Sequence, residues 1–301
     1  MEFHKISYKA HAEKELNADK YKTWTNEDTV DYWRHERMYN LLLPFLKNYK
    51  NANWLTIGDG RFGTDAHFIS KFTDDVLATD INDVHLKIAQ KDGYIKTYQV
   101  ENAEELSFSS DSFDFVFCKE AYHHFPRPSI ALYEMLRVAK TAVIIIEPND
   151  QNTSPLTSPL VGSFFKLWQD FKNSLKQILG RKIYYEFGNY ELSGNYVYTV
   201  SKREMEKVAL GLNLPHLVTK ELNDHYIDGI EYEYISESGP LLRSLKKQIN
   251  FLDKRSMSGR SRSNILFTAI FKEGISDKLG QQLNIEKYNV INLPRNPYLD
   301  V

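Results

Sequence analysis

Residues 54–147 alternate between short apolar runs and amphipathic stretches, and this alternation constrains the fold more than any other feature. The apolar runs predict five strands, at 54–57, 75–81, 95–100, 113–120 and 141–148. The stretches between them predict helices at 64–72, 82–93 and 129–140. Such alternation is typical of an α/β fold, with a parallel sheet covered by helices on both faces. Continuous apolar runs fit strands that are buried on both sides.

The rest of the chain is predicted to surround this unit. Residues 1–50 are expected to form an N-terminal helical segment, in which Thr25 caps a helix with Asp28 three residues later. A core domain is expected at 51–149 and 200–274, a lid-like, aromatic substrate insertion at 150–199 and a C-terminal tail at 275–301. Within the core domain, residues 201–214 predict a capped helix, and 216–222 and 263–273 predict two further strands.

Charge and composition restrict the function classes. The net charge of −2 argues against a nucleic-acid-binding protein, which normally has a basic excess. Cys118 is the only cysteine and lies in an apolar run, so it is interpreted as a buried hydrophobic residue. The first 20 residues lack an apolar core of signal-peptide length, and no apolar run is long enough to span a membrane. A cytoplasmic protein is expected, with no stable membrane insertion and no metal.

A basic, serine-containing stretch at 243–262 is interpreted as a solvated loop before an edge strand. The alternative is that it grips a phosphate on the substrate.

A glycine-rich turn, Gly58-Asp59-Gly60 with Gly63, directly follows the first predicted strand and precedes a helix. Glycines let a backbone turn sharply and approach a ligand, and the helix that follows offers free N–H groups. Asp80 ends the second strand about 20 residues later, the separation at which a carboxylate reaches ribose hydroxyls. Together these features predict a ligand of the adenosine type. They do not choose between NAD and S-adenosylmethionine.

Three further segments resemble the class I S-adenosylmethionine-dependent methyltransferases, in the branch with small-molecule substrates. They are "ENAEELSF…DSFDFVF", "AYHHF" and "MLRVAK". The resemblance covers about residues 52–148 closely and 200–272 loosely. It implies a Rossmann-like, doubly wound, seven-stranded and mostly parallel sheet whose last strand, 265–271, is antiparallel. The chain departs from the family pattern at Thr56, where an acidic residue is usual, and by one extra residue between Gly60 and Gly63.

The resemblance also implies how S-adenosylmethionine would be held. The glycine turn would line the methionine end of the cofactor, Asp80 would accept hydrogen bonds from the ribose, and Ile81 would pack on the adenine. The cofactor-binding residues implied in this way are Gly58, Asp59, Gly60, Gly63, Asp80, Ile81, Asn102, Ala103 and Lys119.

Three residues are candidates for catalysis. His123 and His124 follow the fourth predicted strand, at the sheet edge where ligands of open α/β sheets bind, and imidazole has a suitable pKa for a general base. Glu147 follows the fifth strand and is a second candidate. An ordinary packing role for either histidine is the alternative.

We therefore predict methyl transfer from S-adenosylmethionine to a small-molecule acceptor, with oxygen favoured over nitrogen or carbon. The sequence leaves a homodimer open as the assembly. The alternatives are a catalytically inactive methyltransferase-like binding or regulatory protein, an NAD-dependent oxidoreductase, and methylation of RNA or protein.

Overall fold

The computed structural model describes residues 3–13, 21–150, 190–191 and 193–299, and these residues form one eight-stranded sheet. The strand order is β3-β2-β1-β4-β5-β7-β6-β8. The strands are β1 (Trp54–Ile57), β2 (Val76–Asp80), β3 (Tyr98–Val100), β4 (Phe113–Lys119), β5 (Ala139–Pro148), β6 (His216–Leu222), β7 (Ile265–Phe271) and β8 (Asn289–Asn292). Strands β3, β2, β1, β4 and β5 are parallel, whereas β7 is antiparallel to both of its neighbours, β5 and β6.

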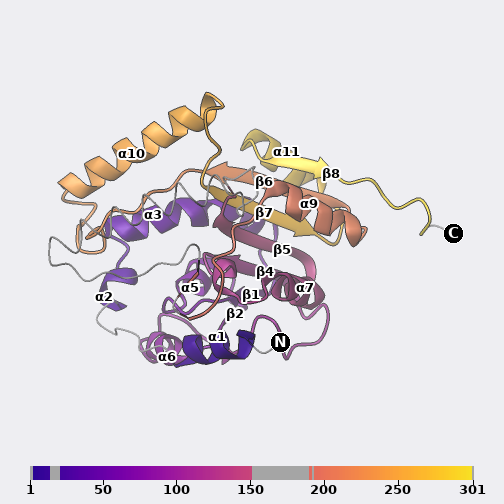
Figure 1. Ribbon diagram of the computed structural model, residues 1–301, viewed down its shortest axis with the longest axis horizontal. Coiled ribbons are helices and arrows are strands. Elements are labelled where there is room, and N and C mark those ends of the chain that lie inside the picture. Colours follow the sequence, from indigo (N-terminus) through magenta and orange to yellow (C-terminus); the bar gives the residue numbers. More distant parts are fainter. Residues whose placement is uncertain (1–2, 14–20, 151–189, 192, 300–301) are drawn as a thin grey trace, which may run out of the picture.

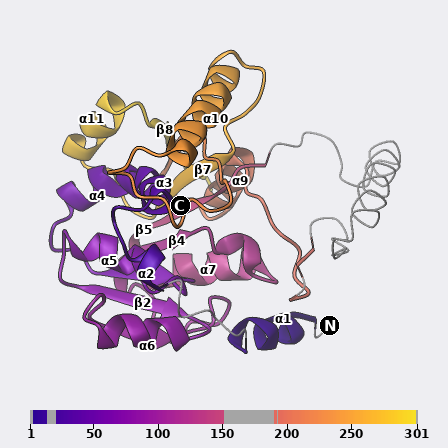
Figure 2. The same ribbon diagram turned by 90° about the vertical axis from the view of Figure 1, so that its left-hand side faces the viewer.

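Helices cover both faces of the sheet (Figures 1 and 2). They are α1 (Phe3–Ala12), α2 (Tyr21–Trp24), α3 (Val30–Tyr39), α4 (Leu43–Asn48), α5 (Thr64–Ser70), α6 (Val84–Lys91), α7 (Pro128–Val138), α9 (Lys202–Gly211), α10 (Pro240–Met257) and α11 (Asp277–Ile285), with 3-10 turns at Asn40–Leu42 and Tyr122–His124. No helix of the described segments combines the length and the apolar character that a membrane span requires.

Alternate residues of the central strands enter two separate cores. In β5, Ile144 and Ile146 pack into the core that also contains α4, α5 and α11, whereas Val143 and Ile145 pack into the core formed with α7 and α9. All four side chains are almost completely buried, as is Cys118. The continuous apolar runs are therefore strands buried on both faces, as the sequence predicts.

The sheet confirms the predicted α/β architecture and the antiparallel strand at 265–271, but its strand number differs from the prediction. Eight strands are present rather than seven, because the segment expected to be a surface tail contributes α11 and β8. Strand β8 pairs with β6, and Leu279 and Leu283 of α11 are buried in the core. The sequence does not predict the short strand "NVIN", because it is flanked by residues typical of loops.

Two local predictions are wrong. The segment 243–262 is not a loop before an edge strand, because most of it belongs to helix α10 and the strand that follows, β7, lies between β5 and β6. Leu242, Leu245 and Ile249 form the buried face of α10, and this apolar spacing outweighs the basic composition. The N-cap of α3 is Thr29 rather than Thr25, since the Thr29 hydroxyl accepts a hydrogen bond from the amide of Tyr32.

The packing of β5 predicts a large cost for shortening Ile144, which is completely buried in the core that also contains α4, α5 and α11. We expect Ile144→Ala to lower the free energy of unfolding by about 2–5 kcal/mol, measured by chemical denaturation. Lys140→Ala, on an exposed position of the same strand, is the control and should change it by less than about 0.5 kcal/mol. Equal effects of the two substitutions would contradict the assigned register.

Candidate active site

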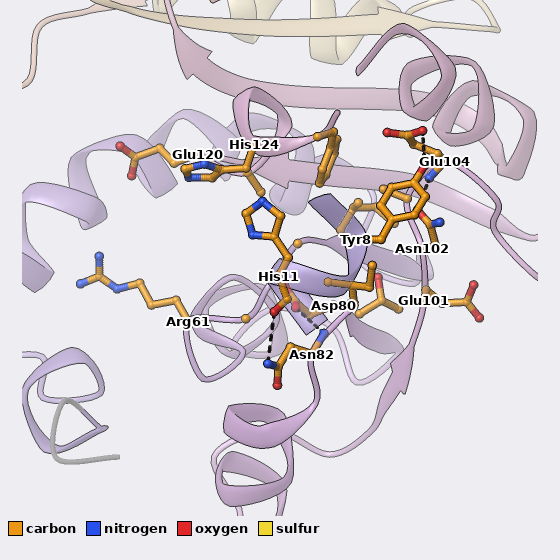
Figure 3. A pocket seen from close by; sticks show the side chains of 18 of the residues that line it. Tyr8, His11, Arg61, Asp80, Asn82, Glu101, Asn102, Glu104, Glu120 and His124 are labelled. Carbon is orange, nitrogen blue, oxygen red and sulfur yellow. Dashed lines mark hydrogen bonds between the residues drawn. The ribbon is translucent and has the colours of Figure 1, made fainter. Parts of the chain in front are cut away.

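The carboxyl ends of β1, β2 and β4 meet around a cavity of about 340 Å³. This edge of an open α/β sheet, at the point where the strand order reverses, is where such folds bind ligands. Figure 3 shows polar side chains around the cavity from α1, the glycine turn and the segments that follow β2, β3 and β4. The residues lining it are Tyr8, His11, Trp24, Ile57, Gly58, Gly60, Arg61, Thr79, Asp80, Ile81, Asn82, His85, Glu101, Asn102, Ala103, Glu104, Glu120, Ala121, His124, Phe125 and Pro126.

Gly58 and Gly60 let the backbone lie directly against the cavity. A Cβ atom at Gly60 would lie 2.7 Å from Oδ2 of Asp80, and a Cβ atom at Gly58 would collide with that of Ala121. Gly58 also has a φ of +73°, a conformation that L side chains rarely adopt. A side chain at either position would therefore displace the residues that shape the cavity.

Asp80 is held at the centre of the cavity by backbone amides. Its Oδ1 accepts a hydrogen bond of 2.8 Å from the amide of Asn82. Burial raises the pKa of Asp80 to about 6, although hydrogen bonds from backbone amides, including that of Gly60, oppose the shift. A carboxylate in this position can accept two hydrogen bonds from a ribose diol, which are charge-assisted and strong.

One end of the cavity is closed by helix α1. Tyr8 donates a hydrogen bond to Glu104 and accepts one of 2.9 Å from Nη2 of Arg127. Arg127 also donates to Glu104 through its backbone amide, at 2.7 Å. Asn82 donates to the carbonyls of His11 and Ala12, so the middle and the C-terminal end of α1 are tied to the cavity rim. Asn102 and Ala103 lie at this same end, where the family resemblance would place the adenine.

The opposite end carries a guanidinium and a carboxylate, from Arg61 and Glu120 (Figure 3). His35 lies between them: its Nε2 contacts the guanidinium groups of Arg34, at 2.8 Å, and Arg61, and its Nδ1 lies 3.2 Å from Oε2 of Glu120. Burial and the neighbouring cations Arg61 and Lys119 lower the pKa of His35 to about 3, so the ring is neutral. Nδ1 of this neutral ring also lies 3.2 Å from Nζ of Lys119.

Glu120 is ionised although most of its side chain is buried. Burial would raise its pKa, but His35, Lys119 and Arg34 hold it well below the usual range. A carboxylate and a guanidinium at one end of the cavity complement the ammonium and carboxylate groups of a methionine moiety. Together with the Asp80 carboxylate at the centre and the Asn102 amide at the other end, this donor and acceptor set fits S-adenosylmethionine.

The two predicted histidines lie in different environments. His124 lines the cavity, and its Nδ1 lies 2.8 Å from Oε1 of Glu191. Burial would raise the pKa of Glu191, but the nearby His124 lowers it to about 2. His123 instead contacts Oε2 of Glu147 at 2.6 Å and is not among the residues that line the cavity.

Several predicted residues lie behind the cavity wall and are not among the residues that line it. Asp59 is buried under the glycine turn, and Gly63 is the N-cap of α5, where a Cβ atom would lie 2.7 Å from Ile95. The ammonium of Lys119 points to Asp65, at 3.4 Å. Glu147 accepts hydrogen bonds from the amides of Ala121 and Tyr122, so it fixes the turn after β4. These carboxylates and the lysine turn inward because buried backbone amides and charges need partners.

The predicted residues that do line the cavity are Gly58, Gly60, Asp80, Ile81, Asn102, Ala103 and His124. Sequence reasoning missed Arg61 and Glu120, although each is adjacent to a predicted site residue. It also missed Tyr8 and His11, which carry no motif and reach the cavity only because α1 folds back over it. Within the described residues, no group of three histidine, cysteine or acidic side chains is arranged to hold a metal ion.

The raised pKa of Asp80 predicts a pH-dependent affinity for S-adenosylhomocysteine. Because the ionised carboxylate accepts the ribose hydrogen bonds, affinity should be constant above pH 7 and fall as the pH drops through about 6. We expect about tenfold weaker binding at pH 5 than at pH 7, measured by calorimetry. Asp80→Asn should bind weakly with no such step. A step of the same size in Asp80→Asn would show that another group titrates.

The contact of α1 with the cavity predicts slower ligand release when Tyr8 is intact. Tyr8→Phe removes the hydroxyl shared by Glu104 and Arg127, a loss of about 1 kcal/mol, so S-adenosylhomocysteine should dissociate about fivefold faster in stopped-flow measurements. Tyr133→Phe, on the exposed side of α7, is the matched control and should leave the rate unchanged. An unchanged rate in Tyr8→Phe would mean that α1 does not limit release.

Comparison with known proteins agrees with this site. Residues 55–146 match the family model described as a methyltransferase domain. No curated protein is similar enough to count as a match.

Similar solved structures include the YcgJ protein from Bacillus subtilis, at 22% identity over 78% of this chain and 100% of that one, with a TM-score of 0.46. Magnesium protoporphyrin IX methyltransferase from Synechocystis PCC 6803, solved with S-adenosylhomocysteine, shares 13% identity over 86% of this chain and 89% of that one, with a TM-score of 0.43. A methyltransferase from Methanosarcina mazei shares 19% identity over 77% and 98%, with a TM-score of 0.43. The match of residues 55–146 to the methyltransferase-domain model confirms the family resemblance and the S-adenosylmethionine cofactor that the sequence motifs imply.

Proposed function

We propose that the protein transfers a methyl group from S-adenosylmethionine to a hydroxyl group of a small-molecule acceptor in the cytoplasm, with His124 as the general base. The observation that carries this proposal is the position of His124 on the cavity wall, with Nδ1 beside the Glu191 carboxylate. The low net charge of the chain favours a small molecule over a nucleic acid as the acceptor.

When bound, S-adenosylmethionine supplies an activated methyl group, so the protein's own contribution is alignment of the acceptor and removal of a proton. Alignment of two bound reactants can lower a barrier by about 7–11 kcal/mol. Glu191, as a carboxylate, favours the proton of a neutral His124 on Nδ1. The lone pair of Nε2 is then available to accept the acceptor's hydroxyl proton, and the same carboxylate stabilises the imidazolium that results.

His123 and Glu147 are assigned a supporting role instead. Glu147 is completely buried and is occupied by two backbone amides and by Nδ1 of His123. These bonds hold the turn that presents Glu120, Ala121 and His124 to the cavity. A carboxylate with all these partners is poorly placed to accept a proton from an acceptor.

Substitution of His124 tests the proposal. We expect His124→Gln to lower methyl transfer to a panel of hydroxylated small molecules by about 10²–10⁴-fold, because it removes the base. The assay measures S-adenosylhomocysteine released with each acceptor. Affinity for S-adenosylhomocysteine should change less, since Asp80 and the glycine turn remain.

His225→Gln, on an exposed loop outside the cavity, is the matched control and should keep full activity. Retention of activity in His124→Gln would remove His124 as the base. Normal cofactor binding with no transfer to any acceptor by the wild type would favour the catalytically inactive alternative.

A further inference from the structure

Helix α10 lies at the outside of the molecule (Figures 1 and 2). It carries a concentration of positive charge. Residues 243–262 contain seven lysines and arginines and one acid, a net charge of +6, whereas the whole chain carries −2. The seven cations are Arg243, Lys246, Lys247, Lys254, Arg255, Arg260 and Arg262, and all are exposed. None of the residues that line the cavity belongs to this stretch. The charge is therefore unrelated to the cofactor site.

The inner face of α10 is fully occupied by the protein. Leu242, Leu245 and Ile249 pack against Val30 and Ile230. Near the end of the helix, Asp253 accepts a hydrogen bond of 2.8 Å from Nδ2 of Asn223. These contacts fix the rotation of the helix about its axis, so the opposite face is held outward.

The outward face combines cations with apolar side chains. Arg243, Lys247, Phe251 and Lys254 are separated by four, four and three residues, which places them in one row along the helix. Phe251 is 54% exposed and lies between the cations of this row, and Met257 at the end of the helix is 87% exposed. Arg255 lies beside the Phe251 ring, 5.7 Å from its centroid.

We propose that this face of α10 binds an anionic lipid bilayer, so that the protein docks peripherally on a membrane surface. Lysines and arginines near the surface of a bilayer attract its anionic headgroups, and exposed aromatic and methionine side chains enter the boundary between headgroups and acyl chains. A row of cations along one rigid helix can reach such a surface along its whole length. Phe251 and Met257 favour a bilayer over a nucleic acid, which offers phosphates but no apolar layer for both side chains.

Co-sedimentation with vesicles tests this proposal on the full chain. The wild type should bind vesicles of phosphatidylcholine mixed with phosphatidylserine but not vesicles of phosphatidylcholine alone, and raised salt should weaken binding. A triple variant, Lys247→Gln, Lys254→Gln and Arg255→Gln, should bind about 100-fold more weakly, about fivefold for each cation removed. Phe251→Ser should weaken binding at constant charge.

The matched control removes the same charge from another helix. Lys202, Arg203 and Lys207 are exposed on α9, and their replacement by glutamine should leave vesicle binding unchanged. Every variant should bind S-adenosylhomocysteine like the wild type, which shows that it is folded. The proposal is overturned if the wild type binds neutral vesicles equally well or no vesicle at all, if the α9 control loses as much affinity as the α10 variant, or if a single-stranded RNA oligonucleotide binds more tightly than the anionic vesicles.

Discussion

The site depends on one buried carboxylate, Asp59, inside the turn that joins β1 to α5. Its two oxygens accept hydrogen bonds from the amides of Asp65 and Ala66, at 3.1 and 2.9 Å, and from the Thr56 hydroxyl at 2.9 Å. It therefore serves as the cap that α5 lacks at Gly63 and ties that helix to the preceding strand. Because Asp59 holds the turn on its buried side, Gly58 and Gly60 face the cavity.

A second set of buried charges extends from this turn to α3. Lys119 reaches Asp65, Arg61 pairs with Asp31, and Arg34 pairs with Asp224. Isolated charges are costly to bury, so each of these groups is stable only because the next one lies beside it. The neutral ring of His35 joins the set to Glu120. An ionised carboxylate and a paired guanidinium consequently face the cavity.

The cavity and the outward face of α10 have separate electrostatic roles. Around the cavity, acids and cations are paired, and only a few atoms of Asp80, Glu120 and Arg61 are turned to the ligand space. On α10 the cations are exposed, and Glu233 accepts hydrogen bonds from the amides of Leu241 and Leu242 at the start of the helix. Paired charges define the shape of a site, whereas unpaired charges of one sign create a field that extends from the surface. Because these two charge patterns are separate, the cofactor site and the membrane-binding face that we propose on α10 can be assigned independently.

The sequence by itself determined the architecture and the centre of the site. Apolar runs mark the buried strands, and the spacing from Gly58 and Gly60 to Asp80 is local information, because β1, its turn and β2 are consecutive in the chain. The sequence could not determine which polar side chains turn inward. It predicts Asp59, Glu147 and Lys119 as site residues, but Asp59 and Glu147 bond to buried amides and Lys119 pairs with a buried charge. The aromatic insertion predicted at 150–199 lies outside the described residues for 151–189. Only the tertiary structure decided that α1 brings Tyr8 to Glu104, that Glu191 meets His124, and that 289–292 becomes an edge strand. These contacts join segments about 70 to almost 100 residues apart, and no local pattern encodes a partner at that distance.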